Sequence, residues 1–140
     1  MKSDGTAGSS TEGGRVDTDY PLFRSADAFL MLAECAARGA ADEAEGLNAL
    51  NAIRTRANLP ELSTYDLDIV LDERARELFW ECGRRTDLIR YGHFTSIAYP
   101  WPYKGGVPDG KIALPSYRTI FPLLQSDLSE NPNLVQNPGY

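Results

Sequence analysis

The stretch that decides the fold is DLDIVLDERARELFWECGRRTDLIRYGHF, residues 66–94. It predicts one long helix, a short break at Gly83, and a second, shorter helix that ends at Gly92. Apolar residues recur here at three- and four-residue steps and are expected to line one buried face: Val70, Leu71, Ala75, Leu78, Phe79 and Cys82. The predicted fold class is mainly α, with a charged helix pair over residues 64–94.

The other positions of this stretch are crowded with charge, and every base among them is an arginine. Four-residue spacing would let Asp72 meet Arg76 and Glu81 meet Arg85. One interpretation is a solvated face whose weak pairs contribute little to stability. The planar fork of arginine suits partly buried carboxylates and favours a second interpretation. That interpretation is an enclosed ionic network formed by some of the following residues: Glu73, Arg76, Glu77, Arg84 and Asp87.

Residues 20–60 predict a tetratricopeptide-like helical hairpin rich in alanine. The first helix is expected from about Leu22 to Arg38, with Gly39 as its stop. Asp42 is expected to cap the second helix, which the sequence Asn-Leu-Pro closes at 58–60. The buried face of the first helix should contain Leu22, Ala26, Phe29, Leu30, Ala33 and Ala37.

The two ends of the chain differ from this helical part. Residues 1–19 have almost no apolar content and predict a flexible polar leader. Residues 95–140 are rich in proline and predict a long irregular C-terminal strap laid across the helices, with one helical turn at 126–130 and no sheet. Its apolar anchors are expected to be Leu114, Tyr117, Ile120, Phe121, Leu123 and Leu124.

Composition excludes several classes of function. A length of 140 residues is enough for one domain with a real core. The composition, 42% hydrophobic and 24% charged, is typical of a globular chain. A net charge of −6 argues against a nucleic-acid partner, for which a basic stripe would be expected. No apolar run reaches the roughly 18 residues of a membrane span, and the first residues lack the apolar segment of an export signal.

Residues suited to catalysis or metal binding are sparse. His93 is the only histidine, and without a His/Cys cluster at ligand spacing it is expected to be a turn residue. Carboxylate pairs such as Glu73 with Glu77 reach glycosidase separations simply through helical spacing, and arginine neighbours would keep them ionised. The sequence therefore predicts no enzyme, metal or cofactor, with a glycoside-processing enzyme kept as a rival. Cys35 and Cys82 are expected to be buried free thiols, although a disulfide between them stays open.

The aromatic cluster YPWPYKGG, residues 99–106, is the candidate binding site. Tyr99, Trp101 and Tyr103 alternate with prolines that stiffen the backbone. Flat rings on a rigid loop can stack on the apolar faces of sugars. The alternative interpretation is that these rings fill the groove between the strap and the helices, since Trp and Tyr are mostly buried.

Several of these motifs resemble one known family in the same order. Residues 71–94 closely resemble the late helical segment of the SusD/RagB family, and the hairpin resembles its last tetratricopeptide-like pair. YPWPYKGG, the RTIFP step at 118–122 and the ending NPNLVQNPGY are similar to that family's C-terminus. The resemblance covers roughly residues 20–140. It implies a C-terminal portion, preceded in longer members by an export signal, a lipid-bearing cysteine and earlier helical pairs.

The resemblance implies a surface glycan-binding lipoprotein of Bacteroidetes-type outer membranes that serves nutrient uptake and polysaccharide utilisation. It would capture oligosaccharides for a SusC-like, TonB-dependent transporter without catalysis, and would meet the membrane only through a lipid anchor absent from these residues. No glycan-contacting residue is carried over from the family. The alternative is a tetratricopeptide-like protein–protein interaction module without sugar binding. A face near Phe23, Phe29 and Leu30 should stay exposed and promote self-association.

Overall fold

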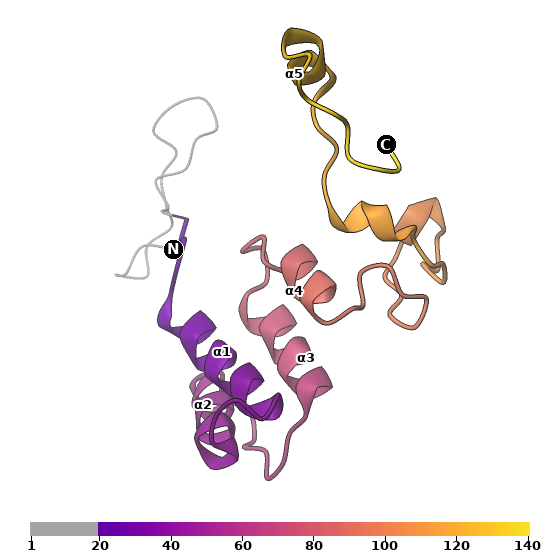
Figure 1. Ribbon diagram of the computed structural model, residues 1–140. Coiled ribbons are helices and arrows are strands. Elements are labelled where there is room, and N and C mark those ends of the chain that lie inside the picture. Colours follow the sequence, from indigo (N-terminus) through magenta and orange to yellow (C-terminus); the bar gives the residue numbers. More distant parts are fainter. Residues whose placement is uncertain (1–19) are drawn as a thin grey trace, which may run out of the picture. The chain divides into compact units, whose positions relative to one another are not determined.

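The computed structural model describes residues 20–140, so the predicted leader over 1–19 lies outside the described residues. The described residues form helices and irregular segments without a β-strand (Figure 1). The predicted mainly α fold class is confirmed. Contacts divide the chain into two compact units, the first ending at Glu81 and the second running from Cys82 to Tyr140.

The first unit contains three helices, which Figure 1 colours from indigo to pink. They are α1 (Ser25–Ala37), α2 (Glu43–Arg56) and α3 (Leu67–Glu77). Helix α1 packs against both α2 and α3. The core of the unit is formed by the following buried residues: Ala26, Leu30, Ala33, Leu50, Ile53 and Val70. The three helices therefore share one apolar core.

Local signals set the ends of these helices. Gly39, at φ +77°, follows α1 and takes the left-handed conformation that costs glycine least. The Asp42 carboxylate accepts a hydrogen bond from the Glu45 backbone N–H at 3.0 Å, so the predicted cap of α2 is confirmed. Asp66 caps α3 in the same way, accepting from the Ile69 N–H at 2.8 Å.

One close approach in this unit depends on a glycine in α2. A Cβ added at Gly46 would lie 2.1 Å from the Tyr65 hydroxyl oxygen and 2.4 Å from the Ala36 Cβ. Both distances are well inside van der Waals contact. The absence of a side chain at Gly46 therefore lets α1 and the segment before α3 approach α2.

The predicted buried face of α1 is partly wrong. Arg24 is extended at φ −148°, so the helix begins at Ser25, and Leu22 precedes it and is exposed. Phe29 is also exposed, although its three- and four-residue spacing from the buried Ala26 and Ala33 places it beside them on α1. Leu30, by contrast, is fully buried and cannot belong to the exposed patch predicted around it.

The long helix predicted from residue 66 ends earlier than expected. Helix α3 stops at Glu77, and Trp80 and Cys82 take left-handed conformations at φ +66° and +58°. Two such residues end the helix before Gly83 is reached. Phe79 is consequently exposed instead of lining the buried face, and Cys82 is exposed as well.

The second unit combines short helices with irregular chain. It contains α4 (Arg84–Arg90), the 3₁₀ helices η1 (Lys104–Gly106) and η2 (Ser116–Thr119), and α5 (Gln125–Glu130). Helix α5 confirms the helical turn predicted at 126–130. The predicted stop after α4 is confirmed at Gly92, whose φ is +73°.

Side-chain hydrogen bonds close the C-terminal end of this unit. Gln136 bonds both the N–H and the carbonyl of Leu123, at 2.8 and 3.0 Å. Asn137 donates to the Phe121 carbonyl at 2.7 Å, and the Tyr140 hydroxyl donates to the Ile120 carbonyl at 2.7 Å. These bonds satisfy backbone groups that no strand partner serves. Three of the predicted apolar anchors are nevertheless exposed: Ile120, Phe121 and Leu124.

Candidate functional site

Two of the three predicted binding aromatics are packed against rings that precede them in the chain. Tyr99 stacks on His93, with ring centroids 5.1 Å apart and planes only 8° from parallel. Trp101 stacks on Phe94, with centroids 5.7 Å apart. Both residues are half-buried. Their rings therefore hold the loop against the segment that follows α4.

A buried lysine holds the same loop. Lys104 is 1% exposed, and its Nζ donates to the carbonyls of Ser96 and Tyr99, the latter at 3.0 Å. The ammonium also lies 4.4 Å from the centroid of the Trp101 ring, a favourable position over an aromatic face. Burial lowers the pKa of Lys104. Sequence analysis missed this residue, because nothing in the local KGG pattern distinguishes a buried lysine from an exposed one.

Tyr103 differs from the other two aromatics. It is 73% exposed and has a left-handed backbone at φ +61°, which is uncommon for a residue with a side chain. The structure thus separates the predicted site residues into two rings that pack within the loop, Tyr99 and Trp101, and one ring presented to solvent, Tyr103. A ligand role for them stays a prediction.

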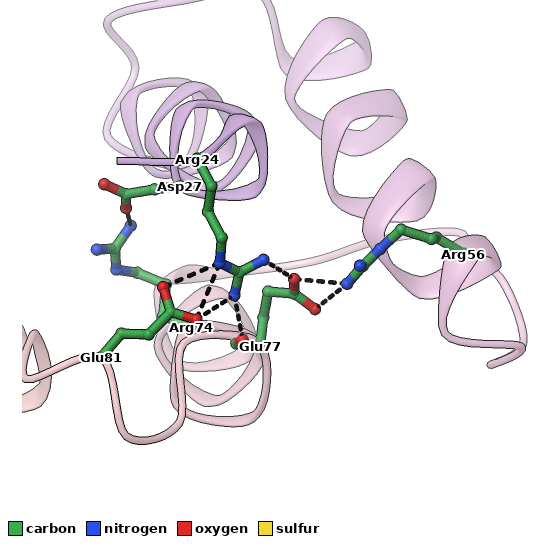
Figure 2. A network of polar contacts seen from close by, with 6 residues as sticks. All are labelled: Arg24, Asp27, Arg56, Arg74, Glu77 and Glu81. Carbon is green, nitrogen blue, oxygen red and sulfur yellow. Dashed lines mark hydrogen bonds and ion pairs between the residues drawn. The ribbon is translucent and has the colours of Figure 1, made fainter. Parts of the chain in front are cut away.

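The first unit contains an ionic network around the end of α3, shown in Figure 2. Arg24 pairs with Glu77 at 2.5 Å and with Glu81 at 2.7 Å, and Arg56 pairs with the same Glu77 carboxylate at 2.5 Å. Arg74 pairs with Asp27 of α1 at 2.9 Å. The pKa of Arg24 is raised, chiefly by its hydrogen bond to Glu81, against the opposing effect of burial.

A separate group of ion pairs in the same unit surrounds a second enclosed carboxylate. Glu73 is 2% exposed and pairs with Arg54 of α2 at 2.8 Å and with Arg76 at 2.9 Å. The prediction of enclosed ion pairs is confirmed for the carboxylates of Glu73 and Glu77, which are 2% and 7% exposed, whereas the Arg76 side chain is 52% exposed. Arg76 pairs with Glu73, three residues before it, instead of with Asp72 as expected.

The other two residues predicted for the network belong to the second unit. There Asp87 pairs with Arg90 at 2.8 Å, and Arg84 donates to the Tyr99 hydroxyl. Sequence analysis missed Arg24, Arg54 and Arg56, because they come from distant positions that four-residue spacing does not connect. With arginines on each carboxylate, this network is suited to holding helices together and offers no free acid or base.

The described residues also show whether side chains gather as metal ligands and where the two cysteines lie. Among residues 20–140, no group of three or more His, Cys, Asp or Glu side chains could hold a metal ion. Cys35 and Cys82 are free, as expected, but both are exposed, so the predicted burial is wrong. None of the helices in this range is long and apolar enough to cross a membrane.

Comparison with known proteins identifies the family. The family model described as SusD family matches residues 1–140. The chain belongs to the SusD family. Starch-binding protein SusD of Bacteroides thetaiotaomicron is 42% identical to this SusD-family chain over 125 residues, which cover 89% of the chain and 22% of the relative. SusD-like protein P25 of Formosa agariphila is 33% identical over 131 residues, which cover 85% of this chain and 24% of the relative.

Solved structures agree with this SusD-family assignment. Surface glycan-binding protein A from Bacteroides uniformis matches with a TM-score of 0.70 and 28% identity, covering 87% of this chain and 28% of that protein. A SusD-like protein from Bacteroides fragilis matches with a TM-score of 0.65, and at 21% identity it supports the fold alone. The chain thus spans 22–28% of the length of these relatives.

These comparisons confirm the predicted membership of the SusD/RagB family and the expectation that the chain is part of such a protein. The relatives with a named function are a starch-binding and a glycan-binding protein. At the level of the family, the prediction that this chain is not an enzyme is therefore confirmed. The interaction module without sugar binding finds no support among these names.

Proposed function

We propose that this chain is part of a surface glycan-binding subunit that captures oligosaccharides for an outer-membrane uptake system. The observation that carries the proposal is the SusD-family match over residues 1–140, together with 42% identity to a starch-binding relative. A SusC-like, TonB-dependent transporter as partner, and a position on the cell surface, belong to the same proposal and rest on family resemblance.

The aromatic loop is the proposed contact of this chain with sugar. Tyr103 presents an exposed ring, while the stacked Tyr99 and Trp101 and the buried Lys104 fix the loop that carries it. A ring held in place loses little conformational entropy when a flat ligand face stacks on it. Tyr99 and Trp101 contribute to this site mainly by positioning, and Tyr103 by direct stacking.

The test is a binding titration of the chain with maltooligosaccharides, chosen because a starch-binding relative is 42% identical. Tyr103→Ala should weaken binding up to about tenfold, the worth of one aromatic contact. Its melting temperature should stay unchanged, because the side chain is exposed. Trp80→Ala is the matched control, since it removes another exposed ring, from the first unit.

Two results would count against this proposal. Equal loss of binding in Trp80→Ala and Tyr103→Ala would show that the loop is not the contact. Unchanged binding in both variants would place the sugar contact elsewhere in the chain.

A further inference from the structure

A groove in the second unit has the size and lining of a ligand site. Its volume is about 650 Å³, within the usual range of small-molecule sites. Ile112 and Leu114 contribute aliphatic side chains, and Phe121 and Tyr140 contribute exposed rings. The groove therefore offers both apolar floor and flat aromatic faces.

The charge of this groove is opposite to that of the whole chain. Its lining includes Arg85 and Arg118 and no acidic side chain. A groove of similar volume in the first unit is lined by three acids, Glu43, Asp66 and Asp68. In a chain with a net charge of −6, a cationic groove marks a place where an anion would be favoured.

Arg85 and Arg118 also lack the partners that other arginines have. Within residues 20–140 neither makes an ion pair with a carboxylate. Ion pairs are made by the following arginines of the same range: Arg24, Arg38, Arg54, Arg56, Arg74, Arg76 and Arg90. Two arginines without a counter-charge thus line one groove, and a ligand carboxylate or similar group could supply it.

Both guanidinium groups lie beside aromatic rings, and that of Arg85 is also held by two backbone carbonyls. The Arg85 guanidinium lies 4.0 Å from the Phe121 ring centroid, and its Nη2 donates to the carbonyls of Arg118 and Thr119 at 3.0 and 3.1 Å. The Arg118 guanidinium lies 5.5 Å from the Tyr140 ring centroid. Arginine positioned in this way presents planar donors suited to a bidentate carboxylate.

We propose that this groove binds an oligosaccharide that bears a carboxylate, such as a uronic acid unit. Arg118, with help from Arg85, binds the carboxylate, and the exposed faces of Phe121 and Tyr140 stack on the apolar faces of the sugar rings. The inference rests on the proposed glycan-binding function and adds to it a second site with a charged ligand class.

The experiment is isothermal titration of the 140-residue chain at low salt with trigalacturonate, its neutral methyl ester and maltotriose. Trigalacturonate should bind at least tenfold more tightly than its ester, and added salt should weaken it. Arg118→Gln should lower trigalacturonate affinity tenfold or more. Arg118→Lys keeps the charge but loses the planar fork, so its trigalacturonate affinity should lie between those of wild type and Arg118→Gln. This variant replaces Arg118→Gln in the test if Arg118→Gln does not fold. Lys111→Gln, an exposed cation outside the lining, should bind like wild type.

Four outcomes would overturn the proposal: equal affinity for the acid and its ester, wild-type affinity in Arg118→Gln, no binding of trigalacturonate, or tighter binding of a hexaglutamate peptide. The last would assign the groove to an acidic protein segment. Binding of maltotriose without trigalacturonate would overturn the uronate site and leave the proposed glycan-binding function standing. Absence of binding by every sugar would count against both.

Discussion

Replacing Glu77 with alanine is expected to destabilise the first unit by about 2 kcal/mol, between the values for exposed and fully enclosed ion pairs. The Glu77 side chain is only 7% exposed and lies 2.5 Å from both Arg24 and Arg56. Its removal takes away the anion that the two cations share. Because those cations come from the segment before α1 and from the end of α2, the change should loosen both contacts with α3.

The expected loss lies below the roughly 3–5 kcal/mol of a fully enclosed pair because neither arginine becomes a buried, uncompensated charge. Arg24 still pairs with Glu81 at 2.7 Å, and its side chain is 26% exposed. Arg56 is 61% exposed and can be hydrated once its partner is gone. The larger share of the loss should therefore come from the contact with Arg24.

The assay is urea unfolding followed by circular dichroism at 222 nm, with double-mutant cycles that pair Glu77→Ala with Arg24→Ala and with Arg56→Ala. The Arg24 cycle should show the larger coupling energy. Glu130→Ala in α5 is the control, since an exposed carboxylate should change stability by less than about 0.5 kcal/mol. A loss below about 1 kcal/mol for Glu77→Ala, or a larger coupling with Arg56, would refute this reasoning.

Three further predictions concern single residues. Gly46→Ala should cost roughly 1–3 kcal/mol through overpacking, whereas Gly83→Ala, at φ −79° and in open space, should leave the melting temperature unchanged. Burial lowers the pKa of Lys104 in the folded chain below its ordinary value of 10.5, which it keeps in the unfolded chain. Between these two pKa values the unfolded chain binds more protons than the folded chain, so the free energy of unfolding should rise with pH. Urea unfolding from pH 7 to 10.5 should show this rise in wild type relative to Lys104→Met, and parallel curves would contradict it. Cys35 and Cys82 should both react with a thiol dye in the native state, and a thiol that reacts only in urea would contradict their exposure.

Features set by local chemistry could be predicted from the sequence. The Asp42 cap needs only a carboxylate placed before a helix, and the Gly39 stop needs only the residue for which a positive φ costs least. Helical spacing likewise places Leu50 and Ile53 on one face of α2, which the structure shows to be buried. Each depends on residues within one or two turns, so the order of residues is enough to place it.

Features set by tertiary contacts could not be predicted in this way. Four-residue spacing indicated Asp72 for Arg76, yet the enclosed Glu73 attracts it together with Arg54 of α2. At the candidate site, prolines indicated a stiff loop but not which ring faces solvent. That choice depends on Lys104, whose carbonyl partners come from earlier turns of the loop.

Helix α1 shows why periodicity alone cannot identify the face that a helix buries. Ala26, Leu30 and Ala33 form its packed stripe, but a second apolar set lies on another side of the helix and is exposed: Ala28, Met31, Leu32 and Cys35. This second set follows the i, i+3, i+4, i+7 spacing of a helix-packing face. Because both stripes satisfy the same rule, only the position of α2 and α3 decides between them. Leu30 therefore leaves the predicted self-association surface, while Phe23 and Phe29 are exposed as expected. The outer stripe adds to this surface an apolar face of helical spacing that can pack against another helix.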